Sequence, residues 1–374
     1  MFTNVLAYKN ANPFIQQKKQ NKQICFTGKE KILTLSSEVL KIVDKVSISK
    51  LEEHLNKLTS PEMEGRGVGQ KGIEIAKKYI ADKFEEFGLK PVENLGLKDY
   101  FQNYITPQYS TSSFGSGNCM KGRVAAWGSN LEGITSNVLG MIKGAENPDE
   151  FLVISAHYDH LGKDERTNIF FPGADDNASG VAALMEVSRI LAKEKPPKKS
   201  VIFAALSGEE ASKTGAEMLA KKLLVNGIAN KTEVLNLEML GGIGGDRLDI
   251  WFRRNTLAKN LVDKLEEAGE IVQTKTQVHL GADPDSDALK FNAKGIPSVC
   301  VAWDYTLAGN HPYYHTSQDT ADKINKNVFK EAVRLITASS YLLAHKLSNK
   351  TISFTSNRIK YNKLKETGER SWVS

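Results

Sequence analysis

Histidine and acidic residues gather in two short clusters on either side of one loop, between residues 151 and 180. The first cluster follows the apolar run FLVISA, and the second precedes a segment whose apolar residues recur at helical spacing. Imidazole and carboxylate groups are the usual ligands of zinc, so the two clusters together indicate a metal site. Their members are His157, Asp159, His160, Asp175 and Asp176.

Each cluster alone also has an ordinary structural explanation. Adjacent aspartates stabilise a helix N-terminus, because the helix dipole favours negative charge there. A histidine at a strand end can be held by a local carboxylate. The metal site is favoured because both clusters occur together, before and after one loop.

Two further acidic positions follow apolar runs later in the chain. Glu209 and Glu210 come after SVIFAAL, and Glu238 follows VLNL. Neighbouring acids suit a metal site, because one can coordinate the ion while the other stays free to take a proton. A helix N-terminus would also explain the pair, and a solvated strand end would explain Glu238 alone. Their shared position after strands again favours the metal site.

The elements that must position these groups alternate between strand and helix. Apolar runs at 151–156 and 200–206 have the length of buried strands, and helical spacing follows at 178–193 and 212–225. The alternation predicts an α/β protein, a three-layer αβα sandwich with a central mixed, largely parallel sheet. In such sheets ligands bind outside the carboxyl ends of the strands, which is where the clusters lie.

Further helices are expected at 47–58, at 72–89 with Gly88 as its stop, and at 324–347. Asn177 is expected to cap the helix that starts at 178. The predicted organisation is a partly ordered N-terminal extension (1–47), one folded domain (48–348) and a basic C-terminal tail (349–374).

Composition excludes several classes of protein. The net charge of +6 is modest and the basic residues are scattered, which argues against nucleic acid as a partner. No apolar stretch approaches the roughly 18 residues of a membrane helix. The three cysteines, Cys25, Cys119 and Cys300, are too far apart for a disulfide framework or zinc ribbon. The first residues lack the apolar core of a secretory signal, which favours a cytoplasmic location.

Six motifs, taken in order, resemble the M28 family of zinc aminopeptidases. They are AHYDH, GADDNASG, SGEE, the strand-end acid of NLEM, SDALKF followed by GIP, and YYHTSQDT. The resemblance runs from about residue 55 to 345 and implies two zinc ions per chain in a peptidase domain. It implies that Asp176 bridges the two ions. The other ligands of one ion would then be His157 and Glu238, and those of the second ion Glu210 and His315. In contrast to the N-terminal sequence, it implies a periplasmic or secreted protein.

The resemblance also implies roles for residues around the ligands. Glu209 corresponds to the general base, and Asp159 to the acid that fixes the tautomer of His157. The peptide bond between Asp176 and the next residue matches a position that is often cis.

Two positions depart from the family pattern. Glu238 stands where Asp is more common and is one carbon longer. The SDH element is Ser286-Asp287-Ala288 here, with no tyrosine shortly upstream to stabilise an oxyanion. Tyr314 is the expected substitute.

The resemblance implies an exopeptidase that hydrolyses N-terminal residues from peptides with a zinc-activated water. Several acids near the motifs have no ligand or base role, and they suit a terminal ammonium group. A carboxypeptidase would instead need a basic residue in the pocket, such as Arg253, Arg254 or Lys290, to bind a terminal carboxylate. A carboxypeptidase, a glutaminyl-cyclase-like enzyme with one zinc, and a non-catalytic binding module are the alternatives. A serine hydrolase is disfavoured by the absence of a GxSxG element. The left-over acids are Asp175, Asp285, Asp287 and Asp319.

Overall fold

The computed structural model describes residues 35–105, 134–164, 167–253, 258–281 and 285–346. Residues 39–347 form one compact unit. Most of the expected N-terminal extension and the whole basic tail lie outside the described residues, as do Cys25 and Cys119.

An eight-stranded mixed sheet runs through the described part of the chain, in the order β1-β2-β4-β3-β5-β8-β6-β7. β3 pairs in parallel with β4 and β5, and β5 with β8, so four central strands run the same way. β2 is antiparallel to β1 and β4, and β6 is antiparallel to β8. The strands are β1 (Phe101–Ile105), β2 (Ile134–Ile142), β3 (Asn147–His157), β4 (Lys199–Leu206), β5 (Thr232–Leu237), β6 (Arg247–Phe252), β7 (Lys275–Leu280) and β8 (Ser298–Trp303).

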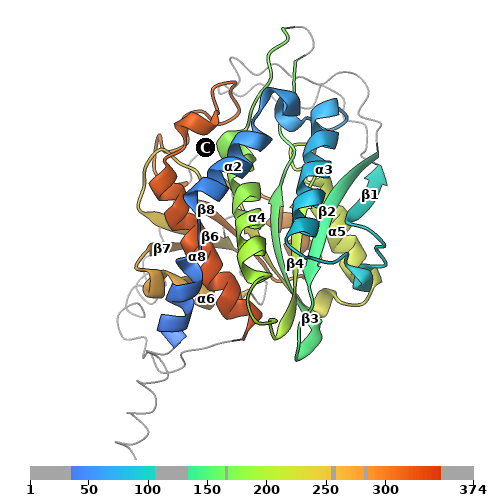
Figure 1. Ribbon diagram of the computed structural model, residues 1–374, viewed down its shortest axis with the longest axis vertical. Helices are drawn as coiled ribbons and strands as arrows, with labels where there is room; N and C mark the ends of the chain where they lie inside the picture. Colours follow the sequence, from blue (N-terminus) through green and yellow to red (C-terminus); the bar gives the residue numbers. More distant parts are fainter. Residues whose placement is uncertain (1–34, 106–133, 165–166, 254–257, 282–284, 347–374) are drawn as a thin grey trace, which may run out of the picture. The chain divides into compact units, whose positions relative to one another are not determined.

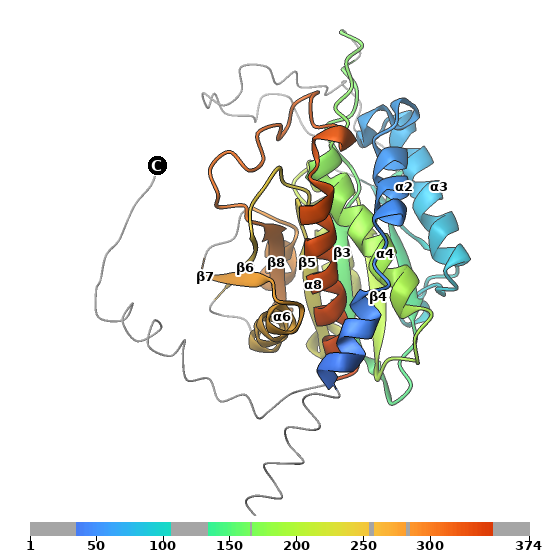
Figure 2. The ribbon, with the colours of Figure 1, turned by 60° about the vertical axis from the view of Figure 1, so that its left-hand side comes forward.

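Helices cover both faces of the sheet, which confirms the predicted αβα sandwich. One layer holds α2, α3, α4, α6 and α8, which contact one another. α2, α4 and α8 lie in front of the strands in Figure 1, and α6 lies next to α8 in Figure 2. The other layer holds α5 and α7. The helices are α2 (Ile48–Leu58), α3 (Lys71–Glu86), α4 (Gly180–Leu191), α5 (Thr214–Val225), α6 (Lys259–Val272), α7 (Ala288–Ala293) and α8 (Lys326–Ala344).

The central strands are buried on both faces, as their continuous apolar sequences require. Every residue of β4 is buried, and β3 is buried from Phe151 to its end. Side chains of β2, β3 and β4 pack against Leu219 and Leu223 of α5 and Phe291 of α7. This packing fixes the strand ends at which the polar clusters sit.

The helix signals predicted from sequence are confirmed, with small shifts of the boundaries. Ser47 caps α2 by accepting a hydrogen bond from the backbone N–H of Lys50, and Gly88 follows α3 in a left-handed conformation. The prediction for Asn177 needs a correction, because the residue that precedes α4 is Ser179. Asn177 still supplies an acceptor, since its Oδ1 lies 3.0 Å from the backbone N of Gly180. Within the described residues, no helix combines the length and the hydropathy of a membrane span.

Candidate metal centre

Three neighbouring parallel strands deliver acidic or histidine residues to one edge of the sheet. His157 is the last residue of β3, and Glu238 immediately follows β5. Glu209 and Glu210 follow the end of β4 within a few residues. Because these strands are parallel and adjacent, their carboxyl ends meet, which brings together residues that are up to 81 positions apart in the chain.

Asp176 approaches the strand ends on an irregular turn between residues 172 and 180. Gly173 is left-handed, and the peptide bond from Asp176 to Asn177 is cis, as the resemblance implied. Asp319 accepts hydrogen bonds from the backbone N–H groups of Asp175 and Asp176, at 2.9 and 3.1 Å. The turn is therefore held from the far side by a carboxylate of another loop.

The first group at this edge joins His157, Asp176 and Glu238. His157 Nε2 lies 3.2 Å from Asp176 Oδ1 and 3.2 Å from Glu238 Oε2. The other oxygen of Glu238 accepts a hydrogen bond from Asn236, so the longer side chain turns one oxygen toward the histidine. The three groups offer ligand atoms within 4.8 Å of one another.

The second group joins His160, Asp176, Glu210 and His315, again within 4.8 Å. His315 Nε2 lies 2.9 Å from Asp176 Oδ2 and 3.1 Å from Glu210 Oε1. The two oxygens of Asp176 thus face different groups, as a bridging carboxylate would. The sequence prediction placed His160 at the strand end but gave it no role.

Opposite charges shift the pKa values of these groups strongly. Burial alone would lower the pKa of His315, but Glu210 and Asp176 outweigh it and raise the pKa to about 10. Burial would likewise raise the pKa of Glu210, but His315 and His160 lower it to about 2. The pKa of His157 lies well above its ordinary value, because Glu238 and Asp176 outweigh burial. The cluster therefore attracts positive charge.

Several buried donor atoms of the cluster have no hydrogen-bond partner among the described residues. They include both ring nitrogens of His160, Oε1 of Glu210 and Nδ1 of His315. Buried polar atoms rarely stay unpaired, because desolvation is not compensated. A divalent cation would pair Nδ1 of His160 and Oε1 of Glu210, which lie 2.9 Å apart, and mixed imidazole and carboxylate donors suit zinc. The residues present thus fit two zinc ions that share Asp176.

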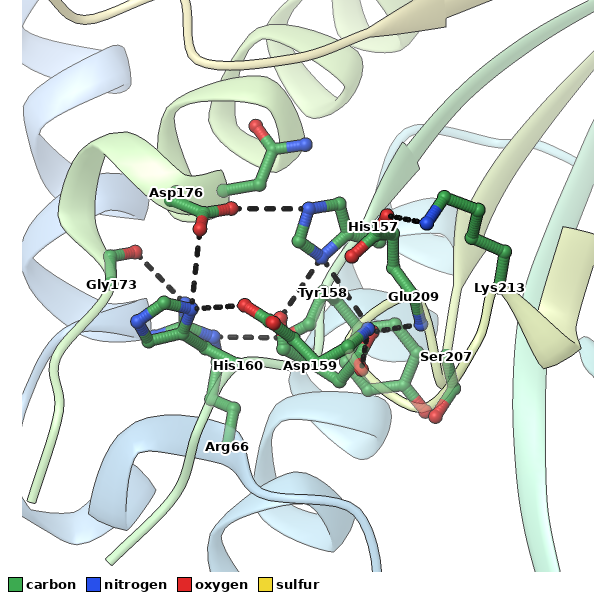
Figure 3. A network of polar contacts seen from close by, with 12 residues as sticks. Arg66, His157, Tyr158, Asp159, His160, Gly173, Asp176, Ser207, Glu209 and Lys213 are labelled. Carbon is green, nitrogen blue, oxygen red and sulfur yellow. Dashed lines mark hydrogen bonds and ion pairs between the residues drawn. The ribbon is translucent and has the colours of Figure 1, made fainter. Parts of the chain in front are cut away.

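Glu209 stands beside the cluster but belongs to neither group. Lys213 Nζ lies 3.3 Å from Glu209 Oε1 and 3.1 Å from Asp285 Oδ1 (Figure 3 shows the first contact). Burial raises the pKa of Glu209 well above its ordinary value, against the opposing charge of His157. Sequence reasoning missed this lysine, although its spacing of four residues from Glu209 was visible.

Asp159 contacts the cluster in a different way from the one expected. Its carboxylate accepts hydrogen bonds from the backbone N–H groups of Glu209 and Glu210, at 3.1 and 3.2 Å. His157 Nδ1 donates to the main-chain carbonyl oxygen of Asp159 at 3.1 Å, while the carboxylate Oδ1 is 3.6 Å away. Either contact keeps a proton on Nδ1, so the proton that His157 would release on binding a metal ion is the one on Nε2, which faces Asp176.

The acids left unassigned from sequence lie in distinct surroundings. Asp175 contacts His311 Nδ1 and accepts from the backbone N–H of Gly241. Asp287 is fully buried, neither of its oxygens has a hydrogen-bond partner among the described residues, and burial raises its pKa to about 8. Burial also raises the pKa of Asp319, to about 7.

The remaining predicted residues are also placed. Tyr314 stacks on the ring of His315 with centroids 3.8 Å apart. Lys290 pairs with Glu217 of α5, 3.2 Å away, rather than with the cluster. Arg253 is exposed, and Arg254 lies outside the described residues.

A buried arginine lies beneath the cluster. Arg66 is fully buried, and its guanidinium donates to the carbonyl oxygens of Leu58, Tyr158, Pro172 and Gly173 at 2.6 to 2.9 Å. Tyr158 belongs to the segment that carries His157 and His160, and Pro172 and Gly173 belong to the turn that carries Asp176. Figure 3 shows Arg66 with Tyr158 and Gly173. Burial lowers the pKa of Arg66 to about 10, so it stays charged at neutral pH and offsets part of the negative cluster.

Comparisons with known proteins point to one family. A sequence model described as "Peptidase family M28" matches residues 137–340. A "Probable zinc metalloprotease" of Leptosphaeria maculans is 30% identical over 215 residues, which cover 56% of this chain and 45% of the relative. "Aminopeptidase YwaD" of Bacillus subtilis is 28% identical over 217 residues, which cover 55% of this chain and 44% of the relative. The matched regions thus span less than half of each relative.

Solved structures share the fold. BSAP, a zinc aminopeptidase from Bacillus subtilis, aligns with a TM-score of 0.64 at 16% identity, covering 81% of this chain and 97% of that one. A glutaminyl cyclase from Bacteroides thetaiotaomicron aligns with a TM-score of 0.58 at 20% identity, covering 79% and 98%. At these identities the likeness concerns the fold alone.

Proposed function

This chain belongs to peptidase family M28, and from that premise we propose that it is a zinc-dependent exopeptidase that releases amino-terminal residues from peptides. The observation that carries the proposal is the position of Asp176. Its Oδ1 lies 3.2 Å from His157 and its Oδ2 lies 2.9 Å from His315, so one carboxylate faces two donor groups. A pair of ions is the arrangement that such a carboxylate would bridge.

Zinc ions held there would supply Lewis acidity, which polarises a peptide carbonyl and acidifies a water. The protein's own contribution is a proton acceptor, and Glu209 fits that task. Its carboxylate lies outside both donor groups, and burial raises its pKa well above the ordinary value, which strengthens it as a base. Lys213 contacts one of its oxygens and limits how far the side chain can turn.

Recognition of a free amino end is supported by the charges around the cluster. Lys213 is the basic side chain that contacts Glu209, and Asp285 and Glu209 both neutralise it. Asp287 is buried without a hydrogen-bond partner among the described residues, and with its pKa raised to about 8 by burial it would gain its charge when a cation binds beside it. Such surroundings suit an ammonium group better than a carboxylate, and a relative is named an aminopeptidase.

Two measurements on one preparation test the proposal. Elemental analysis after zinc reconstitution should find about two zinc ions per chain. Leucine p-nitroanilide should be hydrolysed, and its N-acetylated form should be cleaved little or not at all. C-terminal amidation of a longer peptide should have little effect.

Each alternative has its own outcome in the same experiment. About one zinc with activity retained would favour the cyclase-like enzyme. If C-terminal amidation prevented cleavage and N-terminal acetylation did not, the enzyme would be a carboxypeptidase. Two bound zinc ions without hydrolysis of any peptide would favour the binding module.

A further inference from the structure

The second donor group holds one histidine more than the resemblance supplied. We propose that His160 is a direct ligand of the ion in that group, so that four protein donors enclose this ion while the ion beside His157 keeps an open position. The inference rests on the proposed pair of zinc ions and assigns the two ions different tasks.

The position of the His160 ring supports coordination rather than a hydrogen bond. The side chain is buried, and its Nδ1 lies 2.9 Å from Glu210 Oε1 and 3.7 Å from Asp176 Oδ2. Despite this closeness, neither Nδ1 nor Glu210 Oε1 has a hydrogen-bond partner of acceptable geometry among the described residues. Their lone pairs are therefore free for a shared partner, and a cation is the partner that fits both.

The backbone leaves room for this ring. Gly173 is left-handed, with φ +58°, and a Cβ atom at this position would lie 2.5 Å from Cγ and Cδ2 of His160. Any side chain at residue 173 would therefore displace the imidazole from the group. The same turn carries Asp176, so the glycine lets ring and carboxylate approach each other.

The number of donors separates the two groups. The second group offers four, from His160, Asp176, Glu210 and His315, whereas the first offers three, from His157, Asp176 and Glu238. Four protein donors fill the tetrahedral sphere of zinc, while catalytic zinc sites keep one position open.

The difference in donor number gives the two ions different tasks. Glu209 belongs to neither group, so it leaves the donor count of each group unchanged. We assign the enclosed ion to holding Asp176, Glu210 and the two loops in place.

Cadmium-113 provides a direct count of coordinated imidazoles. In protein loaded with two ¹¹³Cd ions, proton–cadmium correlation spectra should connect ring protons of three histidines to cadmium, two of them to the same ion. His160→Gln should lose one of these connections and keep the other two. His279→Gln, which changes a histidine of β7 outside both groups, should keep all three.

Zinc affinity provides the second readout. His160→Gln should weaken one of the two zinc sites by more than about 100-fold, because even loss of an outer partner of a ligand costs 10 to 100-fold. The other site should change by less than about 3-fold, and its retained cadmium signal shows that the variant is folded.

Two results would overturn the proposal. Two cadmium ions with only two coupled histidines would show that His160 is not a ligand, although the proposed function would stand. Equal weakening of both sites in His160→Gln would show a general effect on the loops. Failure of the wild-type protein to bind cadmium or zinc at all would instead contradict the proposed function itself.

Discussion

Two clusters of aspartate and histidine in this protein look alike in composition but differ in how their polar atoms are used. The second lies between β6 and β7, where Asp249 accepts from His279 Nε2 at 3.0 Å, from Arg247 Nε at 3.2 Å, and from the backbone N and Oγ1 of Thr306 at 3.0 and 3.1 Å. Trp251 stacks on His279. The carboxylate of Asp249 is therefore fully satisfied by protein donors.

The metal centre shows the opposite pattern. Both ring nitrogens of His160, Nδ1 of His315 and Oε1 of Glu210 are buried without hydrogen-bond partners among the described residues. The metal centre also lies beyond the strand ends, whereas Asp249 lies within β6. Residue type alone does not separate a site from a structural cluster, and the unpaired donor atoms do.

Replacement of the proposed base, Glu209, should give the largest effect and would sharpen this contrast most. Glu209→Gln should leave zinc content unchanged, because Glu209 is in neither donor group. We expect kcat to fall by about 10²- to 10⁴-fold, the range for loss of a general base. The matched control is Asp249→Asn, a carboxylate-to-amide change in the other cluster. Near-normal turnover of the Glu209 variant would remove this residue from the mechanism.

Zinc binding should depend steeply on pH at the metal centre. Without metal, neighbouring carboxylates outweigh burial and raise the pKa of His315 to about 10 and that of His157 well above its ordinary value, so both rings carry a proton at pH 7. Zinc binds neutral imidazole, so each ring must release a proton, and affinity rises with pH up to these pKa values.

Calorimetry measures this release. Titrations with zinc at pH 7, in buffers that differ in ionisation enthalpy, should show release of about two protons from the two rings. Binding without proton release would contradict the charge state inferred for the metal-free cluster.

The residue that supports the bridging carboxylate from behind should have a smaller effect. Asp319→Ala removes the acceptor for the backbone N–H groups of Asp175 and Asp176. We expect zinc affinity to fall by about 10- to 100-fold, the usual cost of losing an outer partner of a ligand. Asp319→Asn, which keeps an acceptor oxygen, should lose less. If both variants lost zinc affinity equally, the negative charge of Asp319 rather than its hydrogen bonds would support zinc binding.

The smallest effect on the candidate metal centre is expected from a substitution in the cluster of Asp249 and His279. Asp249→Asn should leave zinc content and kcat within about 2-fold, while urea unfolding should show a loss of about 1–3 kcal/mol, because the change leaves buried donors without an acceptor. A large loss of zinc in this variant would contradict the conclusion that the Asp249 cluster is structural and separate from the candidate metal centre.

Much of the fold could be predicted from sequence, because its central strands are buried on both faces and their apolar runs are unmistakable. β3 and β4 were located within a few residues, and the acids after them followed from the parallel arrangement. β7 was missed, since Lys275–Leu280 is an exposed or half-exposed strand with polar residues and no apolar run.

The site was predictable in its set of residues but not in its details. The approach of His160 to Glu210 depends on the left-handed turn at Gly173, which spacing does not reveal. Lys213 was overlooked because residues 211–213 form turns rather than a helix, so spacing did not predict its direction. The carboxylate of Asp159 contacts backbone N–H groups that only the close packing of two loops brings near.

Arg66 has a consequence for the order in which the protein folds. Three of its four carbonyl partners are 92, 106 and 107 residues further along the chain. Contacts with such long sequence separation form late, because the entropy of closing long loops must be overcome first. A chain that has made its local helices and hairpins therefore still lacks this arginine's bonds. We expect the candidate metal centre to assemble late in folding, so that incompletely folded chains would lack the proposed peptidase activity.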